Sequence, residues 1–217
     1  MSTPSAAATA ANPAAGFYAG IVARSLGLAL RLSQSVAPAA ATRLALRLFF
    51  TPMPFKWAAR RRPLPEGWRV EHWPFEQGAM AVYRRARVRA EAHERPVVLL
   101  VHGWAGSAHQ MLGLADTLDA AGLEPVMLDF PAHGRSAGWR ATLPQFVRAL
   151  WAASARLGPL HGVVAHSLGA VATAHAAANG LPVQRLALLA ASPPPALFLQ
   201  WFARSLGLGE GIPARMG

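Results

Sequence analysis

The sequence predicts an α/β domain with a mostly parallel sheet and helices on both faces, preceded by an N-terminal helical extension. After Gly67, short apolar runs alternate with longer helix-like segments, which is typical of parallel strands joined by right-handed crossovers. Residues 97–115 and 157–184 carry no charged side chain, as expected of strands buried on both faces. Gly, Pro, His and Ser interrupt both stretches, so we do not expect membrane-spanning helices there.

Residues 1–65 form an extension that differs in composition from the rest of the chain. They contain eight basic residues and no acidic one, so they hold most of the formal net charge of +11. We expect residues 16–50 to be at least partly helical, and residues 51–67, with four prolines, to form a linker. The basic residues of the extension are Arg24, Arg31, Arg43, Arg47, Lys56, Arg60, Arg61 and Arg62.

The basic extension raises the question of an anionic partner. Such a segment can meet phosphates or an anionic lipid surface, and it can equally be a solvated basic segment. Peripheral membrane contact through residues 16–50 therefore stays open, as does a membrane-surface or nucleic-acid-binding module built on residues 16–65. For the protein as a whole we expect no nucleic-acid partner. No convincing signal peptide is present, so we expect a cytoplasmic protein, membrane-associated if residues 16–50 make that contact.

The composition also bears on metals and cofactors. The chain has no cysteine, which excludes disulfides, a thiolate nucleophile and cysteine-ligated zinc. Its eight histidines show no metal-ligand spacing such as H-E-x-x-H. We therefore expect neither a metal nor a cofactor, and the oligomeric state stays unknown.

The body, residues 66–217, begins with two segments in which apolar and polar residues alternate. Residues 68–75 and 79–88 are expected to form an antiparallel pair. Further along, Pro144 fits the first turn of a helix and Gly158 its end. The other expected strands are 96–102, 124–130, 160–166 and 183–191, and the expected helices are 109–122, 143–158 and 167–180.

Distinctive residues gather at the carboxyl ends of three expected strands. They are "HGWAGS" (102–107), "DFPAHGRSAG" (129–138) and "AHSLG" (165–169). Ligands of open α/β sheets bind outside the carboxyl ends of the strands. The three segments therefore mark the expected site.

Ser167 is the candidate nucleophile. It lies where a strand is expected to turn sharply into a helix, and Ala165 and Gly169 are the small residues that such a turn requires. The turn is expected to strain the backbone of Ser167 and to expose its hydroxyl above the sheet. The start of a helix favours negative charge, which predicts the backbone N–H of Leu168 as one oxyanion donor.

A second oxyanion donor is expected from the first strand end. His102 and Gly103 let the chain turn back over the site, so that the N–H of Trp104 faces the same oxyanion. His166 is expected to brace the serine turn. We do not expect it to be the base, because its side chain should point away from the Ser167 hydroxyl.

The segments "LLVHGWAGS", "LDFPAHGRS" and "VVAHSLGA", in this order and spacing, resemble the α/β-hydrolase fold family over roughly residues 68–217. Ala165 departs from the usual glycine of the G-x-S-x-G motif, although a small residue still meets the steric requirement. The resemblance implies a serine hydrolase whose oxyanion loop is the turn at His102 and Gly103. It also implies a cap over the active site that begins in residues 192–217.

The resemblance assigns a supporting role to the second segment. It implies that loop 129–138 borders the pocket. Asp129 and His133 of this loop are then structural, and neither is expected in the catalytic triad.

The triad itself is incomplete in the sequence. A serine nucleophile needs a base, and the base needs an acid that orients it. In this family the chain order is serine, acid, histidine. After Ser167 the sequence offers only Glu210 and His175, in the wrong order. We therefore expect the triad acid and histidine to be missing, as in a C-terminally truncated chain.

Two functions of different classes are open. The first is a serine hydrolase acting on a small-molecule ester or related acyl substrate, with this 217-residue chain inactive alone. The second is a non-catalytic binding or scaffold protein that keeps the fold without the triad. A membrane-surface role of the extension is a third hypothesis.

Overall fold

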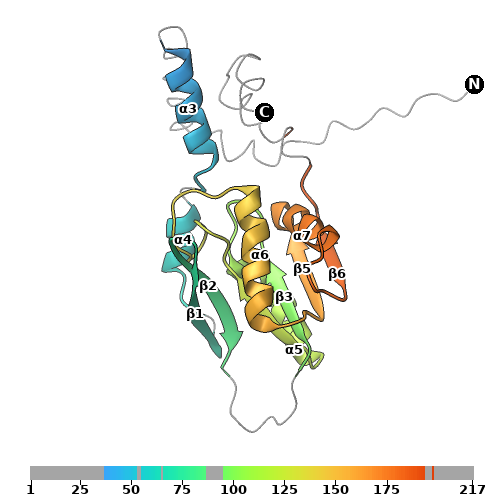
Figure 1. Cartoon of the computed structure of the whole chain (residues 1–217). Helices are drawn as coiled ribbons and strands as arrows, with labels where there is room; N and C mark the ends of the chain where they lie inside the picture. Colours follow the sequence, from blue (N-terminus) through green and yellow to red (C-terminus); the bar gives the residue numbers. More distant parts are fainter. Residues whose placement is uncertain (1–36, 53–54, 65, 87–94, 194–196, 198–217) are drawn as a thin grey trace, which may run out of the picture. The chain divides into compact units, whose positions relative to one another are not determined.

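The computed structural model describes residues 37–52, 55–64, 66–86, 95–193 and 197 (Figure 1). Contacts within the chain divide it into two compact units. One consists of Met1–Phe49 with Pro193–Gly217, and the other is Phe50–Ser192.

The first unit contains helix α3 (Pro38–Phe49). This helix lies inside the segment 16–50 that was expected to be partly helical, whereas Arg24 and Arg31 lie outside the described residues. Arg43 and Arg47, four residues apart, are both exposed and share one face of the helix. In the described part of the chain, no helix combines the length and the apolar composition needed to cross a membrane.

The second unit is built on a six-stranded mixed sheet, which confirms the predicted fold class. The strand order is β1-β2-β4-β3-β5-β6. β1 pairs antiparallel with β2, and β2 with β4, whereas the pairs β3–β4, β3–β5 and β5–β6 are parallel. The strands are β1 (Trp68–Phe75), β2 (Gly78–Arg85), β3 (Val97–Val101), β4 (Glu124–Leu128), β5 (Gly162–His166) and β6 (Leu186–Leu189).

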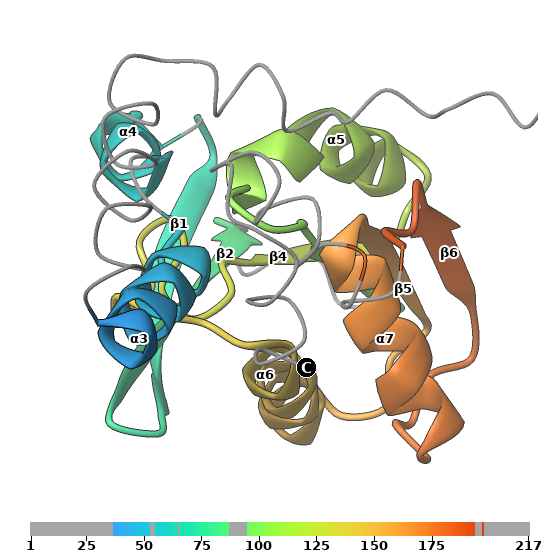
Figure 2. The same ribbon diagram turned by 90° about the horizontal axis from the view of Figure 1, so that it is seen from above.

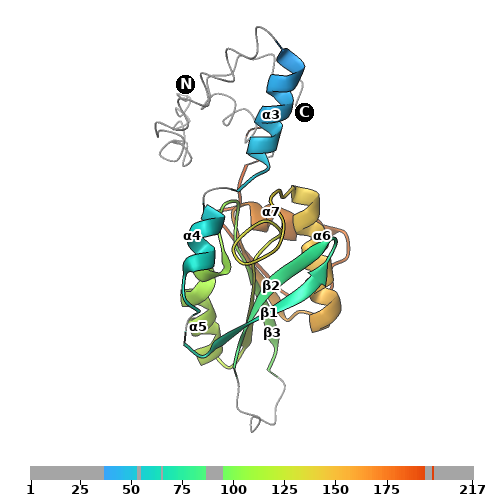
Figure 3. The same cartoon turned by 90° about the vertical axis from the view of Figure 1, so that its left-hand side faces the viewer.

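Helices cover both faces of this sheet. Figures 2 and 3 show α5 (Leu112–Ala120) on one face and α6 (Leu143–Leu157) and α7 (Leu168–Ala178) on the other. Side chains of β3 alternate between two buried clusters: Leu99 and Val101 pack with α6 and α7, and Leu100 packs with α5. Such alternation is the consequence of the strand's two-residue period.

Helix α6 shows how local sequence fixes an element. The Thr142 hydroxyl accepts from the Gln145 amide, and the Gln145 side chain accepts from the Thr142 N–H, so that a capping box opens the helix. Pro144 lies in the first turn, as expected. Gly158 follows the last turn with a φ of 79°, a conformation that glycine adopts without strain.

The segment expected to be a linker contains a helix instead. Helix α4 (Phe55–Arg61) belongs to the compact unit Phe50–Ser192. Its Lys56 is buried, and the Nζ donates to the carbonyl oxygens of Ser136, at 2.8 Å, and Gly138. The prolines that suggested a linker flank α4 and do not interrupt it, so they are compatible with a helix docked on the body.

This arrangement predicts where the extension can be removed. Deletion of residues 1–49 should preserve one cooperative unfolding transition. Deletion of residues 1–61 removes α4 as well, and with it the charged hydrogen bonds of Lys56. The free energy of unfolding should then be about 2–4 kcal/mol lower than after deletion of residues 1–49. Urea unfolding followed by circular dichroism measures both. Equal stability of the two deletions would contradict a structural role for α4.

Candidate active site

Ser167 occupies a strained turn between β5 and α7. Its φ is 54° and its ψ is −120°, a positive-φ conformation that is uncommon for a residue other than glycine. The end of β6 holds this turn, because the Ser167 N–H donates to the Leu189 carbonyl at 2.9 Å and the Ser192 N–H donates to the Ser167 carbonyl at 3.3 Å. The strand-to-helix turn expected at this serine is therefore present.

The turn after β3 lies in direct contact with the serine turn. A Cβ added to Gly103 would stand 2.6 Å from Ser167 Cβ and 3.1 Å from its Oγ. A Cβ added to Gly169 would overlap the carbonyl oxygen of His102. Both positions therefore require glycine, because Gly103 lies against the Ser167 side chain and Gly169 against the backbone of His102.

The two candidate oxyanion donors lie on these touching turns. Leu168 is the first residue of α7, and N–H groups in the first turn of a helix have no acceptor within the helix. Trp104 directly follows Gly103, whose backbone touches Ser167. The Trp104 ring is half-buried, with its centroid 5.2 Å from that of His133 and 6.4 Å from that of Phe146. These ring contacts pack the turn after β3 against the loop after β4 and against α6.

His102 is buried and fully engaged with backbone groups. Its Nδ1 donates to the Gly103 carbonyl at 2.7 Å, and its Nε2 accepts from the Phe130 N–H at 3.1 Å. Burial lowers the pKa of the His102 imidazole, outweighing the opposite effect of the Asp129 carboxylate. The ring is therefore neutral and has no nitrogen left to take a proton from Ser167.

His133 connects the turns after β3 and β4, and both of its ring nitrogens bond to backbone groups, as those of His102 do. Its Nε2 accepts from the Ala105 N–H at 3.1 Å, and its Nδ1 donates to the Pro131 carbonyl at 2.9 Å. Burial, followed by the neighbouring His102, holds the pKa of His133 well below its ordinary value. His133 thus joins two loops and is not poised as a base.

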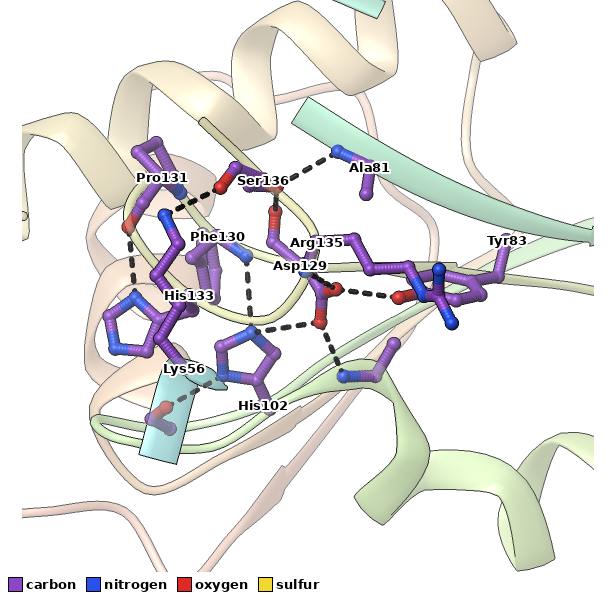
Figure 4. A network of polar contacts seen from close by, with 12 residues as sticks. Lys56, Ala81, Tyr83, His102, Asp129, Phe130, Pro131, His133, Arg135 and Ser136 are labelled. Carbon is purple, nitrogen blue, oxygen red and sulfur yellow. Dashed lines mark hydrogen bonds and ion pairs between the residues drawn. The ribbon is translucent and has the colours of Figure 1, made fainter. Parts of the chain in front are cut away.

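Asp129 is the centre of the polar network beneath the site (Figure 4). Its fully buried carboxylate accepts from the Tyr83 hydroxyl at 2.7 Å, the Ala108 N–H at 2.7 Å and the Arg135 N–H at 2.8 Å. Burial, together with the Asp129 charge, raises the pKa of Tyr83, so its hydroxyl remains a donor. These contacts support a structural role for Asp129.

The remaining histidines near the serine in sequence are exposed. His166 is the last residue of β5, and its side chain is exposed. His175 is exposed on α7, eight residues after Ser167, or roughly 12 Å along the helix axis. Ala165 is buried in β5, as a small residue at this turn should be. Glu210 and most of the expected cap, residues 192–217, lie outside the described residues.

The sequence did not single out three residues that shape this region. Lys56 binds the loop after β4, and Tyr83 and Ser136 bind Asp129. The Ser136 hydroxyl donates to the Asp129 carbonyl oxygen at 2.6 Å and accepts from the Ala81 N–H at 2.8 Å. Lys56 and Tyr83 have partners 80 and 46 residues away, and Ser136 also binds Ala81, 55 residues away, so no local pattern marks these contacts.

Substitution of Gly169 tests the contact between the turns. Gly169→Ala should lower the free energy of unfolding by about 2–3 kcal/mol, because the added methyl group overlaps the His102 carbonyl. Gly113→Ala is the matched control, since that helical glycine has nothing within 4 Å of the added Cβ. It should raise stability by about 0.5–1 kcal/mol through helix propensity. A stabilising effect of both substitutions in urea unfolding would contradict the contact.

The neutral histidines predict an acid-labile fold. Unfolded histidines titrate near pH 6.5, whereas the lowered pKa values keep His102 and His133 neutral in the folded protein. The contribution of these two histidines to the free energy of unfolding should therefore be complete above about pH 7 and be lost as the pH drops below 6.5, by up to roughly 1.4 kcal/mol per pH unit for each histidine. His133→Gln should reduce this slope between pH 7 and 5.5, and an unchanged slope would refute the assignment.

This chain is similar to a known protein family and to several solved structures. A family model described as "alpha/beta hydrolase fold" matches residues 96–215. An epoxide hydrolase from Vigna radiata is 19% identical over 58% of this chain and 41% of that one, with a TM-score of 0.50. A haloalkane dehalogenase loop variant from Bradyrhizobium elkanii is 22% identical over 56% of this chain and 40% of that one, with a TM-score of 0.47. A hypothetical protein from Pseudomonas aeruginosa is 28% identical over 62% of this chain and 52% of that one, with a TM-score of 0.48.

The match to the family is partial in length. The chain spans 41% of the first solved structure compared, 54% of the second and 53% of the third. None of the curated proteins compared with this chain matches it. Because the family match covers more than half of the chain and the sheet, turns and helices have the expected arrangement, this chain belongs to the α/β-hydrolase fold family.

Proposed function

We propose that the chain carries the nucleophile and the oxyanion site of a serine hydrolase that acts on an ester or related acyl substrate. The observation that carries this proposal is the strained backbone of Ser167, at a φ of 54°, in contact with the Gly103 turn. Strain of this kind persists only where the surrounding structure enforces it, and it clusters at functional sites.

The proposed reaction uses two steps. The Ser167 Oγ attacks the acyl carbon while a base removes its proton, and the amides of Leu168 and Trp104 stabilise the negative charge on the carbonyl oxygen. The bond to the alcohol or thiol then breaks, and the leaving group takes up a proton. Water attacks the resulting acyl-serine ester, releasing a carboxylic acid and restoring the hydroxyl.

A serine nucleophile is suited to acyl transfer and unsuited to epoxide opening or halide displacement, the reactions named for two of the similar structures. Opening an epoxide or displacing a halide with a serine oxygen would leave an alkyl ether. An ether has no carbonyl carbon for water to attack, so the enzyme would not be regenerated. An acyl ester has such a carbon. We therefore place the substrate among esters and thioesters.

The base and its orienting acid are proposed to lie outside the described residues. Both ring nitrogens of His102 and His133 are occupied by backbone partners, and a base needs a free nitrogen. We expect this chain alone to be a poor catalyst, because after Ser167 its sequence offers only His175 and Glu210, in the wrong order. The alternative is a non-catalytic binding or scaffold protein with the same fold. Peripheral membrane contact through residues 16–50 is a separate proposal, favoured by the exposed Arg43 and Arg47 of α3.

Added imidazole tests the proposed serine. The chain should hydrolyse p-nitrophenyl acetate barely above background, because only oxyanion stabilisation and binding remain. Imidazole should supply the missing base and raise turnover of the chain more than that of Ser167→Ala. A fluorophosphonate probe with imidazole should label the chain and not the variant.

Two outcomes contradict parts of this proposal. Equal rates of the chain and Ser167→Ala with imidazole, together with absent labelling, would favour the non-catalytic alternative. Robust turnover without imidazole, lost in Ser167→Ala, would show that a base is present within these 217 residues.

A further inference from the structure

A basic pocket lies beside the loop that follows β4. It has a volume of about 320 Å³, within the range of sites that hold small ligands. Helix α4, the β1–β2 hairpin and the loop 135–139 all contribute to it, and each belongs to the unit Phe50–Ser192. Its described lining residues are Lys56, Arg60, His72, Ala79, Arg135, Ser136, Ala137, Gly138 and Trp139.

The pocket is unbalanced in charge. Lys56, Arg60 and Arg135 are basic, and none of the described lining residues is acidic. Burial and then the nearby Arg60 lower the pKa of Lys56 to about 8, although the Asp129 carboxylate acts in the opposite direction. Crowding of cations in a partly desolvated pocket is unfavourable until an anion enters.

Some hydrogen-bond donors of Lys56 and Arg135 have no acceptor among the described residues. The Lys56 ammonium has three hydrogens, and its described hydrogen bonds go to the Ser136 and Gly138 carbonyls. The Arg135 guanidinium donates through one Nη to the Arg62 carbonyl at 2.7 Å, whereas its Nε is buried and has no hydrogen-bond partner among the described residues. Phosphate offers oxygens in several directions, with the charge to match several such donors at once.

The pocket lies at the same edge of the sheet as Ser167. β2 runs antiparallel to β4, with Val82 opposite Leu128, so the start of β2 meets the carboxyl end of β4. The Ala137 N–H donates to the Ala79 carbonyl at 2.8 Å, which fixes the loop to that end.

The distance from the serine turn to the pocket follows from the strand order. From β5 to β2 there are three steps, each about 4.8 Å, or roughly 14 Å in all. Figure 2 shows α4 and β5 on opposite sides of this edge.

We propose that the pocket lined by Lys56, Arg60 and Arg135 binds a phosphate group carried by the acyl substrate of Ser167. This inference rests on the proposed function and specifies its substrate class. Acyl chains are apolar, so the phosphate belongs to the leaving alcohol or thiol, which must reach across roughly 14 Å of the sheet edge. Hydrolysis breaks the acyl C–O or C–S bond and leaves the phosphate ester intact on the released alcohol or thiol.

Binding measurements test the phosphate site without requiring turnover. The probes are two acetyl thioesters, of pantetheine and of 4′-phosphopantetheine, which differ only in the terminal phosphate. Titration calorimetry with the full-length Ser167→Ala chain keeps both thioesters intact. The phosphorylated thioester should bind about tenfold more tightly, and inorganic phosphate should compete with it and not with the other.

Neighbouring arginines of α4 provide a matched pair of variants. Arg60 lines the pocket, whereas Arg61 is exposed and does not line it. Arg60→Gln, added to Ser167→Ala, should abolish most of the tenfold difference between the thioesters. Arg61→Gln makes the same change in net charge and should preserve the difference. Both residues are exposed, so neither substitution should change the unfolding transition.

The outcomes separate this inference from the proposed function. Equal affinity for the two thioesters would overturn the phosphate site, whatever the fate of Ser167. An equal loss in Arg60→Gln and Arg61→Gln would overturn it too, because the effect would then come from net charge alone. Tighter binding of the phosphorylated thioester that is lost only in Arg60→Gln supports the site even if the fluorophosphonate experiment fails to label Ser167.

Discussion

The contact between the turns after β3 and β5 is the constraint on which the rest of the site depends. Gly103 touches Ser167, and Gly169 touches the carbonyl of His102, so neither turn can shift without displacing the other. The contact brings the candidate nucleophile together with both segments that bear candidate oxyanion donors, because glycine leaves room for the Ser167 side chain and for the His102 carbonyl. It also explains why only glycine fits at positions 103 and 169, the two points of contact.

The buried polar groups next to that contact stabilise the loops and take no part in the proposed chemistry. Asp129 uses its carboxylate to hold three donors from different segments, and His133 joins two turns. Because an unsatisfied buried polar group is costly, these residues are committed to structure. The same bonds that make the scaffold rigid remove its buried histidines from the list of candidate bases.

The fold could be predicted from sequence because its determinants are local. The alternation of strands and helices, Pro144 in the first turn of α6 and the small residues around Ser167 are visible within short windows. The docking of α4 was not predictable in this way. Lys56 binds carbonyl groups 80 or more residues away, and flanking prolines indicate a linker unless those partners are known. The reason why Gly103 must be glycine likewise appears only when two distant turns meet.

The serine turn also depends on the last strand of the described sheet. Leu189 of β6 accepts the Ser167 N–H, and Ser192 donates back to the Ser167 carbonyl. Yet β6 pairs on one side only within the described residues, and Leu186 and Leu188 are each 42% exposed. A bare apolar strand edge is prone to fraying and to pairing with other chains. Fraying of β6 would therefore displace the Leu189 carbonyl that accepts from the Ser167 N–H, and with it the support for the strained conformation of Ser167.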